Sequence, residues 1–68
     1  MAVLIYGKDS CPYTADAREH FGSRGDVRYL NVKKDAEALR QMLVLSGGQR
    51  RVPVIVEDGK VTIGFGGT

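Results

Sequence analysis

Apolar residues gather in short runs along the chain, and these runs predict the strands of the fold. Residues 2–6, Ala-Val-Leu-Ile-Tyr, form a continuous apolar run that ends at Gly7, which is typical of a strand buried on both faces. Residues 27–32 are rich in β-branched and aromatic side chains and predict a second strand. Residues 52–56 and 60–63 have the same character and predict two further strands.

The segment between the first two strands carries the signals of a helix. We expect this helix to run from Pro12 to Phe21, because Ser10 or Cys11 can act as its N-cap and Gly22 favours its end. Proline also suits the first helical position, where its missing N–H has no partner to lose. A helix between two strands favours a right-handed crossover, so these strands should be parallel.

A second helix is predicted between the second and third strands. It starts near Asp35 and ends at Gly47-Gly48. Apolar residues recur there with helical spacing and predict one buried face, made of Ala36, Leu39, Met42 and Leu43. Arg40 and Gln41 are expected to face outward.

The segment Glu57-Asp58-Gly59 separates the last two strands. Its Asp-Gly pair favours the left-handed backbone of a tight hairpin turn, so these strands should be antiparallel. We therefore predict an α/β fold with the order βαβαββ on one four-stranded mixed sheet. A chain of 68 residues supports at most one small core, so residues 1–68 are expected to form a single domain.

Composition and charge exclude several classes of protein. Hydrophobic residues make up 43% of the chain and charged residues 26%, which is typical of a globular protein rather than a disordered one. The apolar runs are far shorter than the roughly 18 residues of a membrane span. The N-terminus shows no secretory signal, so we expect no membrane association and a cytoplasmic location. The net charge of +2 is mild, and the Arg50-Arg51 pair is too small a basic patch to predict nucleic-acid binding.

The chemistry of the chain centres on Cys11, its only cysteine. One thiol excludes an intrachain disulfide and makes a zinc site within one chain improbable, so no metal is expected. Cys11 follows the first strand and lies at the amino end of the first helix, where unpaired N–H groups and the helix dipole favour a thiolate. Lys8 adds a nearby cation. The alternative is a buried, inert thiol, but the polar neighbours Asp9 and Ser10 favour the reactive interpretation.

Two short motifs resemble those of glutaredoxins. Residues 11–14, Cys-Pro-Tyr-Thr, resemble the Cys-Pro-Tyr-Cys active site of that family, and residues 51–53, Arg-Val-Pro, resemble its Thr-Val-Pro. Lys8 occupies the place of the family's lysine, and the glycine-containing segment 64–68 follows the last hairpin where the family's glycine motif lies. The resemblance implies a thioredoxin-like fold in which the Val52-Pro53 bond is cis and faces the active-site cysteine.

The resemblance also implies a function and a set of site residues. Cys11 would attack a glutathionylated protein or small mixed disulfide, and glutathione, as co-substrate, would regenerate it. Lys8 would pair with the glycine carboxylate of glutathione, and the Val52 backbone would bind its cysteine as an added strand. The substrate-binding residues implied in this way are Lys8, Tyr13, Thr14, Arg51, Val52, Pro53, Gly66, Gly67 and Thr68.

The chain departs from the family at several positions. Thr14 replaces the second cysteine, which disfavours a dithiol mechanism, and Thr68 stands where many members have an aspartate. The Gly64-Phe65 pair resembles redoxins that reduce ribonucleotide reductase and bind glutathione poorly. The Cys-Pro-Tyr-Thr sequence is also similar to a group with selenocysteine at its first position. The family usually continues with a final helix that covers one sheet face, and that helix is absent from this chain. We therefore expect either that the sequence is a piece of a longer chain or that another chain covers that face, and we expect a monomer or weak dimer.

Three other functions stay open at the level of the sequence. Two chains could carry an iron-sulfur cluster with one Cys11 thiolate from each and two glutathiones. Against this, Pro12 and Tyr13 follow the cysteine, whereas cluster carriers of the family typically have Gly-Phe-Ser. The chain could instead be a redoxin electron donor served by a protein reductant. A binding module with an idle thiol is disfavoured by the joint presence of Lys8, Cys11 and Pro53.

Overall fold

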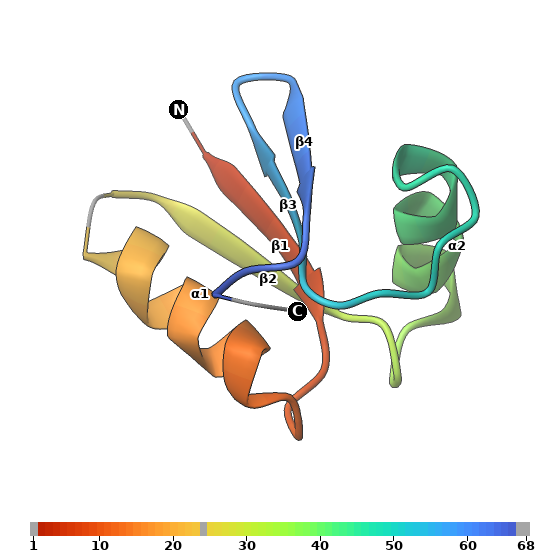
Figure 1. The fold of residues 1–68 in the computed structure, drawn as a ribbon, viewed down its shortest axis with the longest axis horizontal. Coiled ribbons are helices and arrows are strands. Elements are labelled where there is room, and N and C mark those ends of the chain that lie inside the picture. The colour runs from red at the N-terminus through yellow and green to blue at the C-terminus, as the bar shows by residue number, and fades with distance from the viewer. Residues whose placement is uncertain (1, 24, 67–68) are drawn as a thin grey trace.

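A computed structural model describes residues 2–23 and 25–66 of the chain. Four strands and two helices follow one another in the predicted order βαβαββ, which is thereby confirmed (Figure 1). Their bounds are β1 Val3–Gly7, α1 Pro12–Gly22, β2 Val27–Asn31, α2 Ala36–Leu45, β3 Val54–Glu57 and β4 Lys60–Ile63. Neither helix, at 11 and 10 residues, is long and apolar enough to cross a membrane.

The four strands form one mixed sheet in the order β2-β1-β3-β4. β1 pairs with β2 in parallel and with β3 in antiparallel fashion, and β3 pairs with β4 in antiparallel fashion. This topology brings the carboxyl ends of β1, β2 and β4 and the amino end of β3 to the same edge of the sheet. The loops that leave or enter these four ends therefore meet there, and this edge carries the candidate chemistry.

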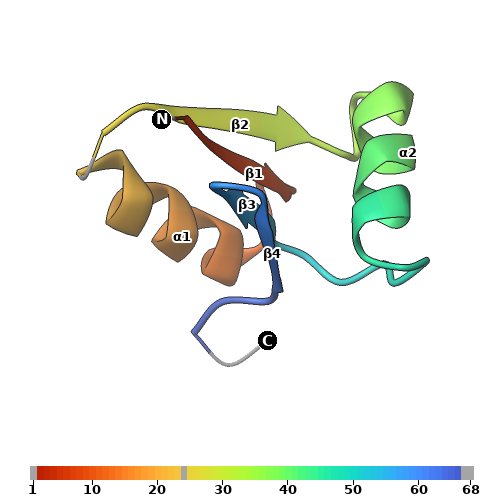
Figure 2. The ribbon, with the colours of Figure 1, turned by 90° about the horizontal axis from the view of Figure 1, so that it is seen from above.

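The helices cover opposite faces of the sheet (Figure 2). Alternate residues of β1 point to the two faces, so Ile5 packs with α1 and Tyr6 packs with α2. The core on the α1 side is Val3, Ile5, Ala17, Phe21 and Ile55, and the core on the α2 side is Tyr6, Val32, Ala38, Met42 and Val54. β1 is therefore the buried central strand that its apolar run predicts.

The apolar residues of the sheet on the α1 side are buried within the described chain. No further helix follows β4 up to residue 66, yet Val3 is 9% exposed and Ile55 only 3%. Phe65, which lies just after β4, packs against this cluster, and its ring lies 6.0 Å from that of Phe21 and 5.5 Å from that of His20. The chain after β4 thus covers its own sheet with an aromatic side chain.

The start of β3 differs from the prediction because of a proline. β3 begins at Val54 rather than Val52, because Pro53 has no N–H for the sheet and its carbonyl instead accepts from the Gly64 N–H at 2.7 Å. The Val52-Pro53 bond is cis, as the resemblance implies. The hairpin turn is confirmed, with positive φ angles of 52° at Asp58 and 76° at the following glycine.

The second helix begins where its cap predicts, and Leu39 and Met42 of its predicted buried face pack in the core. The Asp35 carboxylate accepts hydrogen bonds from the N–H groups of Glu37 and Ala38 at 3.0 and 3.4 Å, which fixes the start of α2. Ala38 and Met42 are the buried positions, whereas Ala36, predicted to be buried, is exposed.

Candidate active site

Cys11 is the N-cap of α1, at the sheet edge where the loops meet. A turn after β1 is closed by the Cys11 N–H, which donates to the Lys8 carbonyl at 3.2 Å, and the Cys11 carbonyl accepts from the Ala15 N–H at 3.2 Å. The backbone at Cys11 is extended, with φ −92° and ψ 116°, as N-caps require. The residue is 8% exposed, so the thiol is largely enclosed by the protein.

The surroundings of Cys11 stabilise its ionised form. Burial raises the pKa of the thiol, because a thiolate loses solvation in the interior. Hydrogen bonds from the Thr14 hydroxyl and from the N–H groups of Thr14 and Tyr13 act in the opposite direction, and the charge of Lys8 adds to them. Together these groups outweigh burial and bring the pKa of Cys11 below its usual value, which raises the thiolate fraction at neutral pH.

Thr14, expected among the substrate-binding residues, lies in the interior beneath the thiol. Its side chain is 1% exposed, and within the described chain its Oγ1 has no hydrogen-bond partner of ordinary geometry. Such a hydroxyl costs about 1–3 kcal/mol when it stays unpaired. An ionised Cys11 supplies the acceptor that the hydroxyl otherwise lacks, so this placement of Thr14 favours the thiolate, and its expected contact with a substrate stays a prediction.

We expect Thr14→Val, which keeps the side-chain shape and removes the hydroxyl, to slow alkylation of Cys11 by iodoacetamide at neutral pH by about tenfold. Hydrogen bonds to charged groups contribute about 1.5–3 kcal/mol, so their loss lowers the thiolate population accordingly. Because the chain has one cysteine, the alkylation rate reports on one site. Thr14→Ser keeps the hydroxyl and should stay near the parent rate. Equal pH profiles for the valine variant and the parent would remove this role from Thr14.

A network of side chains holds Asp9 beside the active-site loop. The Tyr29 hydroxyl donates to Asp9 Oδ1 at 2.8 Å, and Lys34 Nζ lies 3.9 Å from Asp9 Oδ2. Burial, followed by the hydrogen bond and the charge of Asp9, raises the pKa of Tyr29 to about 12, so the tyrosine keeps its proton and donates throughout the physiological range. Asp9, the acidic residue closest to Cys11 in sequence, is therefore held by Tyr29 and Lys34.

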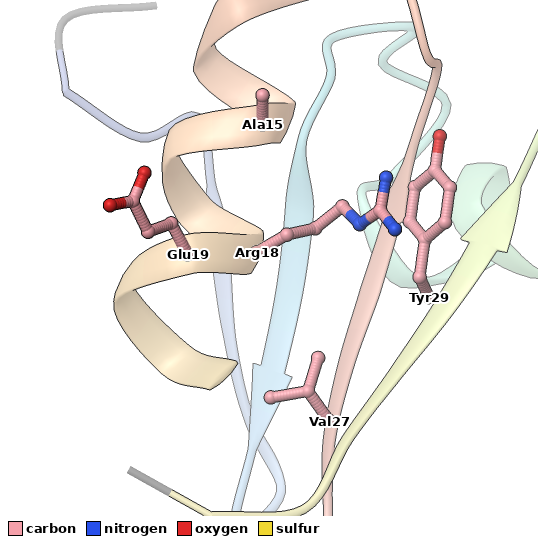
Figure 3. Close-up of a pocket in the computed structure, with 5 residues that line it drawn as sticks. All are labelled: Ala15, Arg18, Glu19, Val27 and Tyr29. Carbon is pink, nitrogen blue, oxygen red and sulfur yellow. The ribbon is translucent and has the colours of Figure 1, made fainter. Parts of the chain in front are cut away.

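Tyr29 also lines a pocket of about 400 Å³ between α1 and β2 (Figure 3). The Arg18 guanidinium lies over its ring, 4.0 Å from the ring centre, in a cation–π contact. The other lining residues are Ala15, Glu19 and Val27. Within residues 2–23 and 25–66, neither Cys11 nor any of the expected substrate-binding residues lines this pocket, so we do not place the chemistry there.

A second pocket, of about 210 Å³, lies at the sheet edge that carries Cys11. It brings together Lys8 and Val52, two of the expected substrate-binding residues. Pro53, the next residue, is fully buried at the amino end of β3, while Arg51 is exposed and does not line the pocket. The other residues that line this second pocket are Val32, Lys33, Leu39, Met42 and Arg50.

Lys33 and Arg50 also line this pocket, although the sequence does not single them out as candidate site residues. One follows β2 and the other precedes β3, so both belong to loops at the edge where Cys11 lies. The predicted strand order could have indicated them, because basic residues next to strand ends at the same edge of a sheet lie on one surface.

The glycine-containing segment after β4 lies near the aromatic residue of the active-site motif. A side-chain carbon built at Gly66 would lie 3.7 Å from Cδ1 of Tyr13, whose side chain is 37% exposed. The structure thus brings two of the expected binding residues together. Gly67 and Thr68, also among the expected substrate-binding residues, lie outside the described residues.

The sequence of the chain identifies its relatives. The family model for glutaredoxin matches residues 3–62. The chain belongs to the glutaredoxin family. No curated protein sequence matches it.

Solved structures agree with the glutaredoxin assignment. The glutaredoxin from Archaeoglobus fulgidus is 27% identical over 94% of this chain and 75% of its own, with a TM-score of 0.78. The glutaredoxin-like NrdH-redoxin from Escherichia coli is 25% identical over 97% of this chain and 86% of its own, with a TM-score of 0.80. The fold is therefore the predicted thioredoxin-like one, and this glutaredoxin-family chain is a thiol-disulfide oxidoreductase.

Proposed function

We propose that this glutaredoxin-family chain is a glutathione-dependent oxidoreductase that works by a monothiol mechanism through Cys11. Its substrates are mixed disulfides between glutathione and a protein or a small thiol. The observation that carries the proposal is the enclosure of the chain's only thiol at the amino end of α1, where Thr14 and Lys8 favour the thiolate. A chain with one cysteine needs a reaction that uses one cysteine.

The proposed cycle has two exchanges. The Cys11 thiolate attacks the glutathione sulfur of the mixed disulfide, a Cys11–glutathione disulfide forms, and the substrate thiolate leaves and takes a proton from solvent. The thiolate of a second glutathione then attacks the glutathione sulfur of this intermediate. Glutathione disulfide leaves, and Cys11 departs as a thiolate, so the low pKa that speeds attack also favours departure.

Glutathione would lie along the edge of the sheet. Lys8 offers a cation for one carboxylate, and Val52, outside the β3 ladder, offers its backbone to an extended chain. Tyr13 and Gly66, which lie side by side, would flank the tripeptide on the other side. The expected roles of Pro53, Arg51, Gly67 and Thr68 stay part of this proposal.

Further expectations follow from this mechanism. Glutathione is a co-substrate, no metal takes part, and the protein partners are glutathionylated or disulfide-containing. We expect a monomer or weak dimer that binds no nucleic acid or membrane. A cytoplasmic location suits it, because glutathione keeps thiols reduced there.

A second candidate is electron transfer from a protein reductant. The NrdH-redoxin from Escherichia coli is described as glutaredoxin-like with a thioredoxin-like activity profile, and this chain shares its fold with a TM-score of 0.80. The chain would then accept electrons from a flavoprotein reductase instead of glutathione. A single cysteine disfavours this route, since the mixed disulfide with the reductase has no second thiol in the chain to resolve it.

The two candidates predict opposite responses to the reductant. With a small glutathione mixed disulfide as substrate, we expect turnover with NADPH, glutathione and glutathione reductase to exceed turnover with NADPH and thioredoxin reductase by at least about tenfold, or 1.4 kcal/mol in barrier. NADPH consumption measures both. Faster turnover with thioredoxin reductase would favour the second candidate.

A further inference from the structure

The two carboxylate oxygens of Asp9 have their partners on β2 and on the loop that follows it. Oδ1 accepts from the hydroxyl of Tyr29 in β2 at 2.8 Å, and Oδ2 lies 3.9 Å from Nζ of Lys34, which follows that strand in the chain. The hydrogen bonds to the Cys11 thiol come instead from the first turn of α1. The carboxylate and the thiol therefore have separate sets of partners.

Asp9 nevertheless belongs to the turn that ends at Cys11. The Cys11 N–H donates to the Lys8 carbonyl at 3.2 Å, so residues 8–11 form one tight turn with Asp9 at its second position. Charged side chains two positions apart in such a turn are close enough to interact, because salt at physiological strength screens charges over about 8 Å. A carboxylate near a thiol disfavours the thiolate. The place that the Asp9 carboxylate occupies therefore bears on the reactivity of Cys11.

Tyr29 is a rigid support for its hydrogen bond to Asp9. Its ring packs against the core cluster on the α1 side, and the Arg18 guanidinium of α1 lies over the ring, 4.0 Å from the centre (Figure 3). Burial, followed by the hydrogen bond and the charge of Asp9, raises the pKa of Tyr29 to about 12, and the charge of Cys11 acts in the same direction. The tyrosine hydroxyl is thus protonated, anchored, and within electrostatic reach of the thiol.

Without this hydroxyl, only Lys34 would remain of the partners that the described residues give to Asp9. The side chains of Lys34 and Asp9 are 78% and 59% exposed, and an ion pair between exposed groups restrains them weakly. The carboxylate would be free to rotate about its side-chain bonds, and its charge would no longer be confined beside β2. Lys8, the neighbouring cation in the turn, acts on the thiol itself.

We propose that Tyr29 is a positioning residue for the reaction of Cys11, because its hydroxyl keeps the Asp9 carboxylate beside β2 and away from the thiolate. Tyr29 acts on the nucleophile only through Asp9. The inference shares with the proposed function only the use of Cys11 as the nucleophile, and it holds whichever thiol regenerates the chain.

The test is the pH profile of Cys11 alkylation by iodoacetamide in the parent, in Tyr29→Phe, in Asp9→Asn and in the double variant. The thiolate displaces iodide and forms a thioether, so the rate follows the thiolate fraction of the chain's only cysteine. The reagent is uncharged, and Asp9 therefore does not steer it. Phenylalanine keeps the ring under Arg18, and asparagine keeps an oxygen that accepts from Tyr29 but carries no charge.

We expect Tyr29→Phe to slow alkylation about two- to threefold at a pH below the midpoint of the profile, and to change the plateau at high pH little. Asp9→Asn should speed alkylation by a similar factor, and this gain should shrink with added salt. In the Asp9→Asn background, Tyr29→Phe should have no further effect, because the charge that the hydroxyl confines is gone.

Tyr6→Phe is the matched control. The Tyr6 hydroxyl donates to Oε1 of Gln41 at 3.1 Å on the α2 side of the sheet, so its loss should leave the alkylation profile unchanged. A Tyr29→Phe or Asp9→Asn chain that alkylates like the parent would overturn the proposal. Equal slowing by Tyr29→Phe with and without the Asp9 charge would overturn it too, since Tyr29 would then act by another route.

These outcomes are distinct from those of the proposed function, because glutathione takes no part in the alkylation. A chain that gives the predicted profiles but turns over no substrate with glutathione keeps this inference and loses the proposed function. Glutathione-supported turnover together with equal alkylation profiles for the parent and Tyr29→Phe does the reverse.

Discussion

Replacing Cys11 by serine is expected to reduce glutathione transfer to the uncatalysed rate. A hydroxyl neither forms a disulfide nor ionises at neutral pH, and no second thiol of the chain can replace it. The parent chain, mixed with an excess of a glutathionylated peptide, should gain one glutathione, visible as a mass increase that dithiothreitol reverses. The serine variant should gain none.

The serine variant also has to be folded for this comparison to count. Serine is close to cysteine in size and is favoured at N-caps, so α1 should keep its start and the thermal midpoint should change little. A folded serine variant that still transfers glutathione would exclude Cys11 as the nucleophile.

Gly7→Ala is expected to destabilise the fold by about 1–3 kcal/mol and to disturb the thiol as well. A side-chain carbon at Gly7, the last residue of β1, would lie 2.5 Å from Cγ2 and 2.6 Å from Oγ1 of Thr14. Both atoms belong to a side chain that is 1% exposed, so either the strand or the helix has to move. Urea denaturation measures the stability, and the alkylation profile of Cys11 measures the displacement of the Thr14 hydroxyl.

A double variant isolates this contact. Thr14→Ala removes both close atoms, so Gly7→Ala combined with Thr14→Ala should cost less stability than the sum of the two single changes. Gly22→Ala is the matched control, because a side-chain carbon at the end of α1 meets no atom within 4 Å and should leave stability unchanged or slightly higher. Additive effects of the Gly7 and Thr14 changes would show that the two residues do not restrain each other.

Local signals in the sequence predict most of the fold. Pro12 at the first helical position, the Asp35 cap and the Asp-Gly turn each act over a few residues, and the structure places elements where these signals predict. The start of β3 was misplaced because the apolar run 52–56 hides the effect of Pro53, which has no N–H for pairing. Gly7 ends an apolar run in the sequence, but its close contact with Thr14 exists only because α1 packs against the end of β1 in the folded chain.

The candidate site is predicted less completely, because its contacts join distant segments. Cys11 and Lys8 follow from one short motif, whereas Arg50 enters the pocket and its neighbour Arg51 does not. Which of two adjacent exposed arginines lines the pocket depends on the path of the loop before Pro53, and residue type gives no signal for that. Phe65 likewise covers the α1 side of the sheet through a turn after β4 that the apolar pattern does not encode.

The most direct test of the central claim is the pH dependence of the first exchange, in which Cys11 takes glutathione from a small mixed disulfide in a single turnover, with the Cys11→Ser variant as baseline. The pKa of Cys11 is lowered, so the thiolate form is lost as the pH falls through that lowered value, and the rate should rise with pH and level off below about 8.5. A rate that equals the serine baseline, or one that keeps rising beyond pH 8.5 as for an ordinary thiol, would contradict an activated monothiol at Cys11.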